Sequence, residues 1–189
     1  GALLIQPAKY AGISFTSSVN PLVDIEDGSD NTRNIYGVGN LYLQFSPLKG
    51  IDLKSTFSPS FKSKRRGRYW GSMTDNRKFQ DPAANLQNDL DLQYTWDNQI
   101  TATKNLNDHS LTVMGVQSFY YTQYEGNEID VTDLPFNSSY YNLGTAANLQ
   151  SVASSFSKTT LMSYAFRVNY GWKDKYLITL SNRWDGSSV

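Results

Sequence analysis

The chain has 189 residues, 17 basic and 17 acidic side chains that sum to a net charge of zero, no cysteine and a single histidine, His109. This balance argues against a general nucleic-acid binder, which needs excess positive charge. The lack of cysteine excludes disulfides, thiolate zinc sites and cysteine nucleophiles, and no apolar run approaches the roughly 20 residues of a membrane-spanning helix.

Strand-type alternation of apolar and polar residues recurs along the chain and predicts an all-β fold of antiparallel, up-and-down strands. The six predicted strands cover about residues 36–46, 51–58, 90–104, 109–124, 159–172 and 175–184. A further strand is predicted near residues 13–16. In the first hairpin, Leu41, Leu43 and Phe45 alternate with polar residues, and residues 46–50 have the composition of a turn.

The second and third hairpins have short turns at residues 105–108 and at Lys173-Asp174. In the third hairpin, apolar side chains occupy every second position from Met162 to Trp172 and continue on the return strand. A slip of one residue would exchange the apolar and polar faces of both strands, so the sequence specifies the register well.

Two long polar segments, residues 58–89 and 125–159, separate the hairpins and are predicted to be loops. Loops of this length are uncommon in soluble sandwiches, whereas outer-membrane barrels have short turns on one side and long loops on the other. The fold class predicted here is therefore a large transmembrane β-barrel. The alternative is a soluble β-sheet protein in which the apolar faces form a core.

In a barrel, the polar face of the third hairpin would line a hydrated lumen. The lumen-lining candidates are Arg167, Asn169, Thr179 and Arg183. Trp172 and Tyr176, beside the last turn, are placed where an interfacial aromatic girdle is expected.

Aromatic side chains in the predicted loops and at strand ends are candidates for stacking on a substrate. The substrate-contact candidates are Tyr69, Trp70, Tyr121, Tyr124, Tyr140 and Tyr141. The alternative for these rings is loop packing or an outer aromatic girdle, which is usual in such barrels.

Other motifs point to no catalytic or metal site. The basic run Lys62–Arg68 could attract acidic sugars or lipid phosphates, but is interpreted as a solvated loop. The acidic segment Asp24–Asn31 lacks the ligand spacing of a calcium loop and is interpreted as a polar turn. No nucleophile motif accompanies His109. The sequence therefore predicts a protein that is not an enzyme and needs no cofactor.

Four segments of the chain resemble motifs of one family, in the same order along the chain. They are residues 40–55 with the central Pro47-Leu48-Lys49-Gly50, residues 94–115, residues 163–180 and residues 183–188, Arg-Trp-Asp-Gly-Ser-Ser. All four are similar to hairpins of the SusC/RagA-type TonB-dependent receptors, and Asn20-Pro21-Leu22 is similar to a further element of that family. The chain departs from the family at Trp184, where arginine is usual.

The resemblance implies that the chain is an internal segment of a β-barrel, with the plug domain and the remaining strands lying outside it. It also implies an outer-membrane location and import of oligosaccharides or peptides, driven by the TonB complex. The expected partners are a SusD-type surface lipoprotein, the substrate and outer-membrane lipid, with no nucleic acid. The alternative function is a soluble β-rich glycan-binding module.

Overall fold

The computed structural model describes residues 21–135, 137–173 and 175–188; the strand predicted near residues 13–16 and Asp174 of the last turn lie outside this part. A short helix, α1 (Pro21–Glu26), precedes the strands, and a single 3-10 turn, η3 (Leu143–Thr145), lies in a connection. The strands are β1 (Gly28–Val38), β2 (Leu41–Leu48), β3 (Ile51–Trp70), β4 (Ala83–Leu106), β5 (His109–Thr132), β6 (Asn148–Trp172) and β7 (Tyr176–Ser188).

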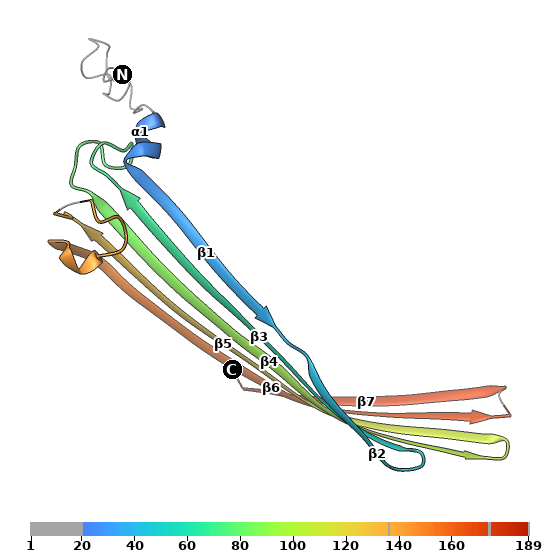
Figure 1. Cartoon of the computed structure of the whole chain (residues 1–189). Coiled ribbons are helices and arrows are strands. Elements are labelled where there is room, and N and C mark those ends of the chain that lie inside the picture. Colours follow the sequence, from blue (N-terminus) through green and yellow to red (C-terminus); the bar gives the residue numbers. More distant parts are fainter. Residues whose placement is uncertain (1–20, 136, 174, 189) are drawn as a thin grey trace. The chain divides into compact units, whose positions relative to one another are not determined.

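All seven strands belong to one sheet, in the order β1-β3-β4-β5-β6-β7, with β2 also paired to β3 (Figure 1). The pairs β2–β3 and β6–β7 are antiparallel. β1 and β2 are two parts of one interrupted strand, because both pair with β3. At the interruption the Gly39 amide donates to the Pro59 carbonyl at 2.9 Å. The all-β antiparallel fold predicted from the sequence is confirmed.

The central strands are longer than predicted. β3 continues to Trp70, β4 begins at Ala83, β5 continues to Thr132 and β6 begins at Asn148. The long loops predicted over residues 58–89 and 125–159 are therefore wrong for much of their length, and the connections shrink to residues 71–82 and 133–147. The reason is that alternation reports a strand with one apolar face, so a strand that is polar on both faces carries no such signal.

The chain divides into two compact units, and each central strand contributes to both. Unit 1 contains residues up to Ile35, Ser63–Leu90 and Glu125–Ser155. Unit 2 contains Tyr36–Lys62, Asp91–Tyr124 and the residues from Phe156 onward.

Unit 1 has a small apolar core. Its buried members are Tyr69, Ala84, Val131, Leu134 and Tyr140. The connection between β5 and β6 supplies Leu134 and Tyr140, and the Tyr140 ring lies so close to Gly67 that an added Cβ would be 2.1 Å from it. This connection therefore covers one face of the sheet in unit 1.

Unit 2 is amphipathic and its apolar face is bare. Residues that pair across the strands share a face, and these pairs include Tyr164 with Trp184 and Val168 with Leu180. Leu180 is 67% exposed and Trp184 is 60% exposed. Among the described residues, every buried apolar side chain belongs to unit 1. The apolar face of unit 2 thus has no protein partner in the described part of this chain.

The short turns of unit 2 depend on backbone conformations with positive φ. These occur at Gly50 (86°), Asn107 (48°) and Lys173 (51°). The turns after β4 and β6 are also joined, because the Lys173 amide donates to the Asp108 carbonyl at 2.7 Å.

Replacing Gly50 with alanine is expected to destabilise the first hairpin. An added Cβ would lie 2.3 Å from the Thr103 carbonyl oxygen, and it would disturb the bond from the Thr103 amide to the Gly50 carbonyl, which measures 2.6 Å. Strain of this kind costs about 1–3 kcal/mol. Urea unfolding of the full-length protein measures the loss. Asn107→Gly is the matched control, since glycine adopts positive φ freely; equal stability of Gly50→Ala and the parent would contradict the structure.

Candidate functional site

The polar face of unit 2 gathers the four residues predicted to line a lumen. In the β6–β7 register, Ala165 pairs with Arg183, Arg167 with Ser181 and Asn169 with Thr179, so the four side chains share one face of the hairpin. The Thr179 hydroxyl donates to the Asn169 side-chain oxygen at 2.9 Å. Their common face follows from the register, and their role as a lumen lining stays a prediction.

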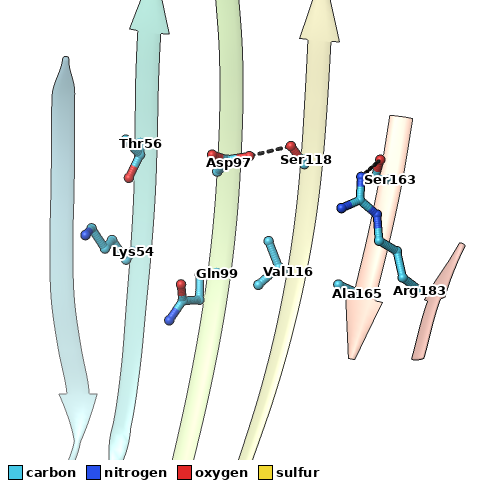
Figure 2. A pocket seen from close by; sticks show the side chains of 9 residues that line it. All are labelled: Lys54, Thr56, Asp97, Gln99, Val116, Ser118, Ser163, Ala165 and Arg183. Carbon is cyan, nitrogen blue, oxygen red and sulfur yellow. Dashed lines mark hydrogen bonds between the residues drawn. The ribbon is translucent and has the colours of Figure 1, made fainter. Parts of the chain in front are cut away.

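The same unit contains a polar cavity of about 380 Å³, whose lining residues extend along one face of the sheet from β3 to β7 (Figure 2). It is lined by Lys54, Thr56, Asp97, Gln99, Val116, Ser118, Ser163, Ala165 and Arg183. Ser118 donates to Asp97 at 2.5 Å and Arg183 donates to Ser163 at 3.3 Å (Figure 2). Charges of both signs are therefore spread over this surface, which suits a hydrated environment.

Aromatic side chains of unit 2 cluster around Tyr94. The Tyr94 ring stacks on Tyr121 with centroids 4.8 Å apart and lies 5.5 Å from Phe57. Phe57 pairs with Leu41 on the apolar face. Tyr121 therefore belongs to the apolar face, which fits the girdle alternative better than substrate contact. Tyr124 lies three positions further along the strand, where alternation places it on the opposite face.

A second aromatic group marks the short turns of unit 2. Trp172 and Tyr176 stack with centroids 5.6 Å apart, and the Lys173 ammonium lies 5.4 Å from the Trp172 ring. His109 and the Tyr170 hydroxyl form a hydrogen bond of 2.7 Å. His109, the first residue of β5, therefore contacts a side chain of β6.

Unit 1 contains a polar network around Asn85, which is fully buried. Arg68 donates to the Asn85 side-chain oxygen at 2.9 Å from one nitrogen and 3.1 Å from another. The Asn85 amide donates to Glu128 at 2.8 Å and to Asp130 at 2.6 Å. Asp130 also accepts from Ser151 at 2.8 Å. The network joins β3, β4, β5 and β6, and no sequence pattern had indicated it.

The basic run Lys62–Arg68 lies within β3, so its interpretation as a solvated loop is wrong. Ion pairs join Lys64 to Asp89 at 3.9 Å and Arg68 to Glu128 at 3.6 Å. Arg66 binds both carboxylate oxygens of Asp30, at 2.9 and 2.5 Å. These hydrogen bonds lower the pKa of Asp30. Most of the positive charge in this run is therefore balanced within the sheet.

The remaining substrate-contact candidates differ in exposure. Tyr69 and Tyr140 are 5% and 7% exposed and pack in the core of unit 1, so neither ring is available to stack on a ligand. Burial, together with the charge of Asp27, raises the pKa of Tyr69. Tyr141 is 65% exposed, and its hydrogen bond with Tyr140 raises its pKa. Trp70 is half-buried at the end of β3, with the Arg68 guanidinium 5.3 Å from its ring centre.

Trp70 lines a second cavity, of about 570 Å³, within unit 1. The cavity is formed by Asp24, Ile25, Gly28, Ser29, Asp30, Tyr69, Trp70, Thr74, Asp75 and Asn76. Asp24 accepts from the Asp75 amide at 2.8 Å, and Asp27 accepts from the Met73 amide at 3.1 Å. The acidic segment Asp24–Asn31 was predicted as a polar turn, and this is wrong, because its residues belong to the end of α1 and the start of β1. Its carboxylates hold the connection between β3 and β4. Asp75 and Asn76 carry no motif, and only the fold brings them to Trp70.

The described residues carry neither a metal-binding cluster nor a membrane-spanning helix. No group of three or more histidine, cysteine or acidic side chains there is arranged to hold a metal ion. No helix in the described part is long and apolar enough to cross a membrane.

Two proteins of Formosa agariphila resemble the chain over nearly its whole length. TonB-dependent receptor P26 is 27% identical over 175 residues, which is 90% of this chain, and TonB-dependent receptor P3 is 27% identical over 170 residues, which is 89%. The chain is similar to a segment of the TonB-dependent receptors. The resemblance indicated by the sequence motifs is confirmed. The chain spans 18% and 17% of these two relatives, and no model of a known protein family matches it.

Solved structures agree on the fold. A chain of the RagAB peptide transporter superposes with a TM-score of 0.79 at 15% identity, over 90% of this chain and 19% of that one. The closed-closed state of the RagAB peptide importer gives 0.80 at 16% identity, with the same coverage. At this identity the likeness concerns the fold alone. It confirms the predicted fold class, antiparallel strands of a large β-barrel.

Proposed function

We propose that the chain forms part of the wall of an outer-membrane, TonB-linked receptor that imports oligosaccharides or peptides with a SusD-type lipoprotein. The observation that carries this proposal is the apolar face of unit 2, which is bare in the described part of the chain. A soluble protein would bury such a face, whereas an outer-membrane barrel turns it toward lipid. The similarity to TonB-dependent receptors supports the same conclusion.

Strand length supports a sheet that extends beyond the membrane. β4 and β5 have 24 residues each, whereas a tilted strand crosses the bilayer core with about 9–11 residues. The exposed apolar pairs lie in unit 2, while unit 1 has its own core and a network of ion pairs. Unit 1 carries the longer connections, which in outer-membrane barrels lie on the extracellular side.

The residue roles follow from this placement. Arg167, Asn169, Thr179 and Arg183 would line the lumen, and Tyr121 would belong to the aromatic girdle. Tyr124, Trp70 and Tyr141 remain candidates for substrate contact. The lipoprotein would meet the connections of unit 1, and the work of the protein would be transport and not catalysis.

The alternative function, a soluble glycan-binding module, is less well supported. It requires a dry core beneath the amphipathic strands, and all buried apolar side chains in the described residues belong to unit 1. Recovery of the native protein from the soluble fraction, with a cooperative unfolding transition, would favour this alternative.

A pair of single-cysteine variants tests the proposed facing in the full-length protein, with any other cysteine removed. Phe166 and Arg167 are adjacent in β6, and their partners Asn182 and Ser181 lie on opposite faces of the hairpin. In intact outer membranes, a lipid-soluble maleimide should label Phe166→Cys several times faster than Arg167→Cys. A membrane-impermeant maleimide should show no such preference. Equal or reversed rates with the lipid-soluble reagent would overturn the proposal.

A further inference from the structure

The cavity of unit 1 has the size and composition of a small ligand site. Its volume of about 570 Å³ falls in the range of about 300–1,000 Å³ that is usual for ligand pockets. The indole of Trp70, the side chains of Ile25 and Tyr69, and several short polar side chains line it. Most of these groups are held in place by contacts outside the cavity, so the site is formed before a ligand arrives.

The indole of Trp70 is fixed from one side. The Arg68 guanidinium lies 5.3 Å from the ring centre, and Arg68 is itself anchored by Asn85 at 2.9 Å and by Glu128 at 3.6 Å. The indole also lines the cavity, where it can contact a ligand. An aromatic face offers a flat apolar platform, which suits the CH surface of a sugar ring.

The three carboxylates of the cavity already have partners. Asp30 binds Arg66 through both oxygens, Asp75 lies 3.8 Å from the Lys78 ammonium, and Asp24 accepts from the Asp75 amide. A carboxylate offers about four acceptor positions, so each retains capacity for a hydroxyl donor. Asn76 adds an amide that both donates and accepts.

The charge pattern selects against ionic ligands. An anionic group would enter beside three carboxylates, and like charges at close range are unfavourable. A cationic group would approach Arg66 and Lys78, which already pair with carboxylates, and Arg68, which lies against the indole, and their positive charges would repel it. A neutral ligand with several hydroxyl groups meets neither repulsion.

From this geometry we propose that the Trp70 cavity binds one neutral sugar unit of a glycan, stacked on the indole and hydrogen-bonded to Asp24, Asp75 and Asn76. The inference rests on the proposed import function and deepens it, because it assigns this extracellular site to neutral glycans and not to peptides or acidic sugars.

Calorimetric titration of the purified full-length receptor tests the assignment. The probes are cellohexaose, maltohexaose, laminarihexaose and mannohexaose as neutral glycans, hexagalacturonate as an acidic glycan and pentalysine as a cationic peptide. At least one neutral glycan should bind, and Trp70→Ala should weaken that binding about tenfold, as expected for loss of one aromatic contact. Trp70→Phe should retain most of the affinity.

Two further variants sharpen the result. Trp184→Ala removes an exposed tryptophan from the apolar face of unit 2 and should leave glycan affinity unchanged. Asp75→Asn should weaken binding of the neutral glycan less than Trp70→Ala does, because an amide still bonds hydroxyl groups, and it should improve binding of hexagalacturonate. Absence of binding by all four neutral glycans, equal affinity of Trp70→Ala and the parent, or a Trp70-dependent affinity for pentalysine would each overturn the inference. The maleimide experiment needs no ligand, so the receptor proposal and this site can fail separately.

Discussion

Replacing Phe166 with lysine should strongly impair folding of the full-length protein into a bilayer. Phe166 is 44% exposed on the apolar face of β6, and its hairpin partner is Asn182. A lysine on the lipid face costs about 2–4 kcal/mol at the middle of the bilayer and less near the interfaces. Urea titration of the receptor in liposomes, read by the heat-dependent shift of the folded band on a gel, measures this cost.

The control for this substitution is Asn169→Lys, three positions along the same strand and on the polar face. Asn169 is exposed and bonds only Thr179 among the described side-chain contacts. Its replacement should cost well under 1 kcal/mol, because a charge in a hydrated lumen is not desolvated. A larger loss for Asn169→Lys than for Phe166→Lys would reverse the assignment of the two faces.

Replacing Asn85 with leucine is the second change with a large expected effect. Asn85 is fully buried and joins Arg68, Glu128 and Asp130. Leucine has a similar volume but bonds none of them, and each hydrogen bond to a charged group is worth about 1.5–3 kcal/mol. Unit 1 should lose about 2–4 kcal/mol, seen as faster amide hydrogen exchange in residues 83–90 and 125–132.

Two companion variants separate the network from general packing. Asn85→Asp should also be damaging at pH 7, because it replaces the amide that donates to Glu128 and Asp130 with a third carboxylate. Gln87→Leu lies on the same strand and removes a bond made only to Asp89 two residues away. Its effect should stay within about 0.5 kcal/mol. Similar exchange in Gln87→Leu and Asn85→Leu would contradict a special role for Asn85.

The strands with one apolar face were predictable from sequence. The alternation through Leu41, Leu43 and Phe45 and from Met162 to Trp172 reflects a physical difference between two environments, and β2, β6 and β7 carry it along much of their length. The turn at Gly50 was predictable for a related reason, since its composition matches the positive φ that the chain adopts there.

The parts of the strands that lie in unit 1 could not be predicted in the same way. Residues 63–70 and 125–132 are strands whose side chains meet a polar network on one side and a small core on the other, and their composition is that of a loop. The pairing of Arg66 with Asp30 and of Arg68 with Asn85 links residues 36 and 17 positions apart. Only the strand order brings them together.

The candidate site was only partly predictable, because the sequence shows which residues are aromatic but not which of them are buried. Aromatic residues beside polar segments suggested Trp70, but also Tyr69 and Tyr140, which form the core of unit 1. Neighbours in sequence such as Tyr69 and Trp70 differ in burial, since Tyr69 is buried in the core of unit 1 and Trp70 is half-buried, and no sequence pattern separates the two. Asp75 and Asn76 lie on a connection whose shape depends on hydrogen bonds to α1 and the residue after it.

The central claim is that this chain is part of the wall of a longer outer-membrane protein. An antibody raised against residues 1–189 and used to probe outer-membrane and soluble fractions of the source cell tests it directly. We expect an outer-membrane band several times heavier than 21.3 kDa whose mobility changes on heating. A band near 21.3 kDa in the soluble fraction would contradict it.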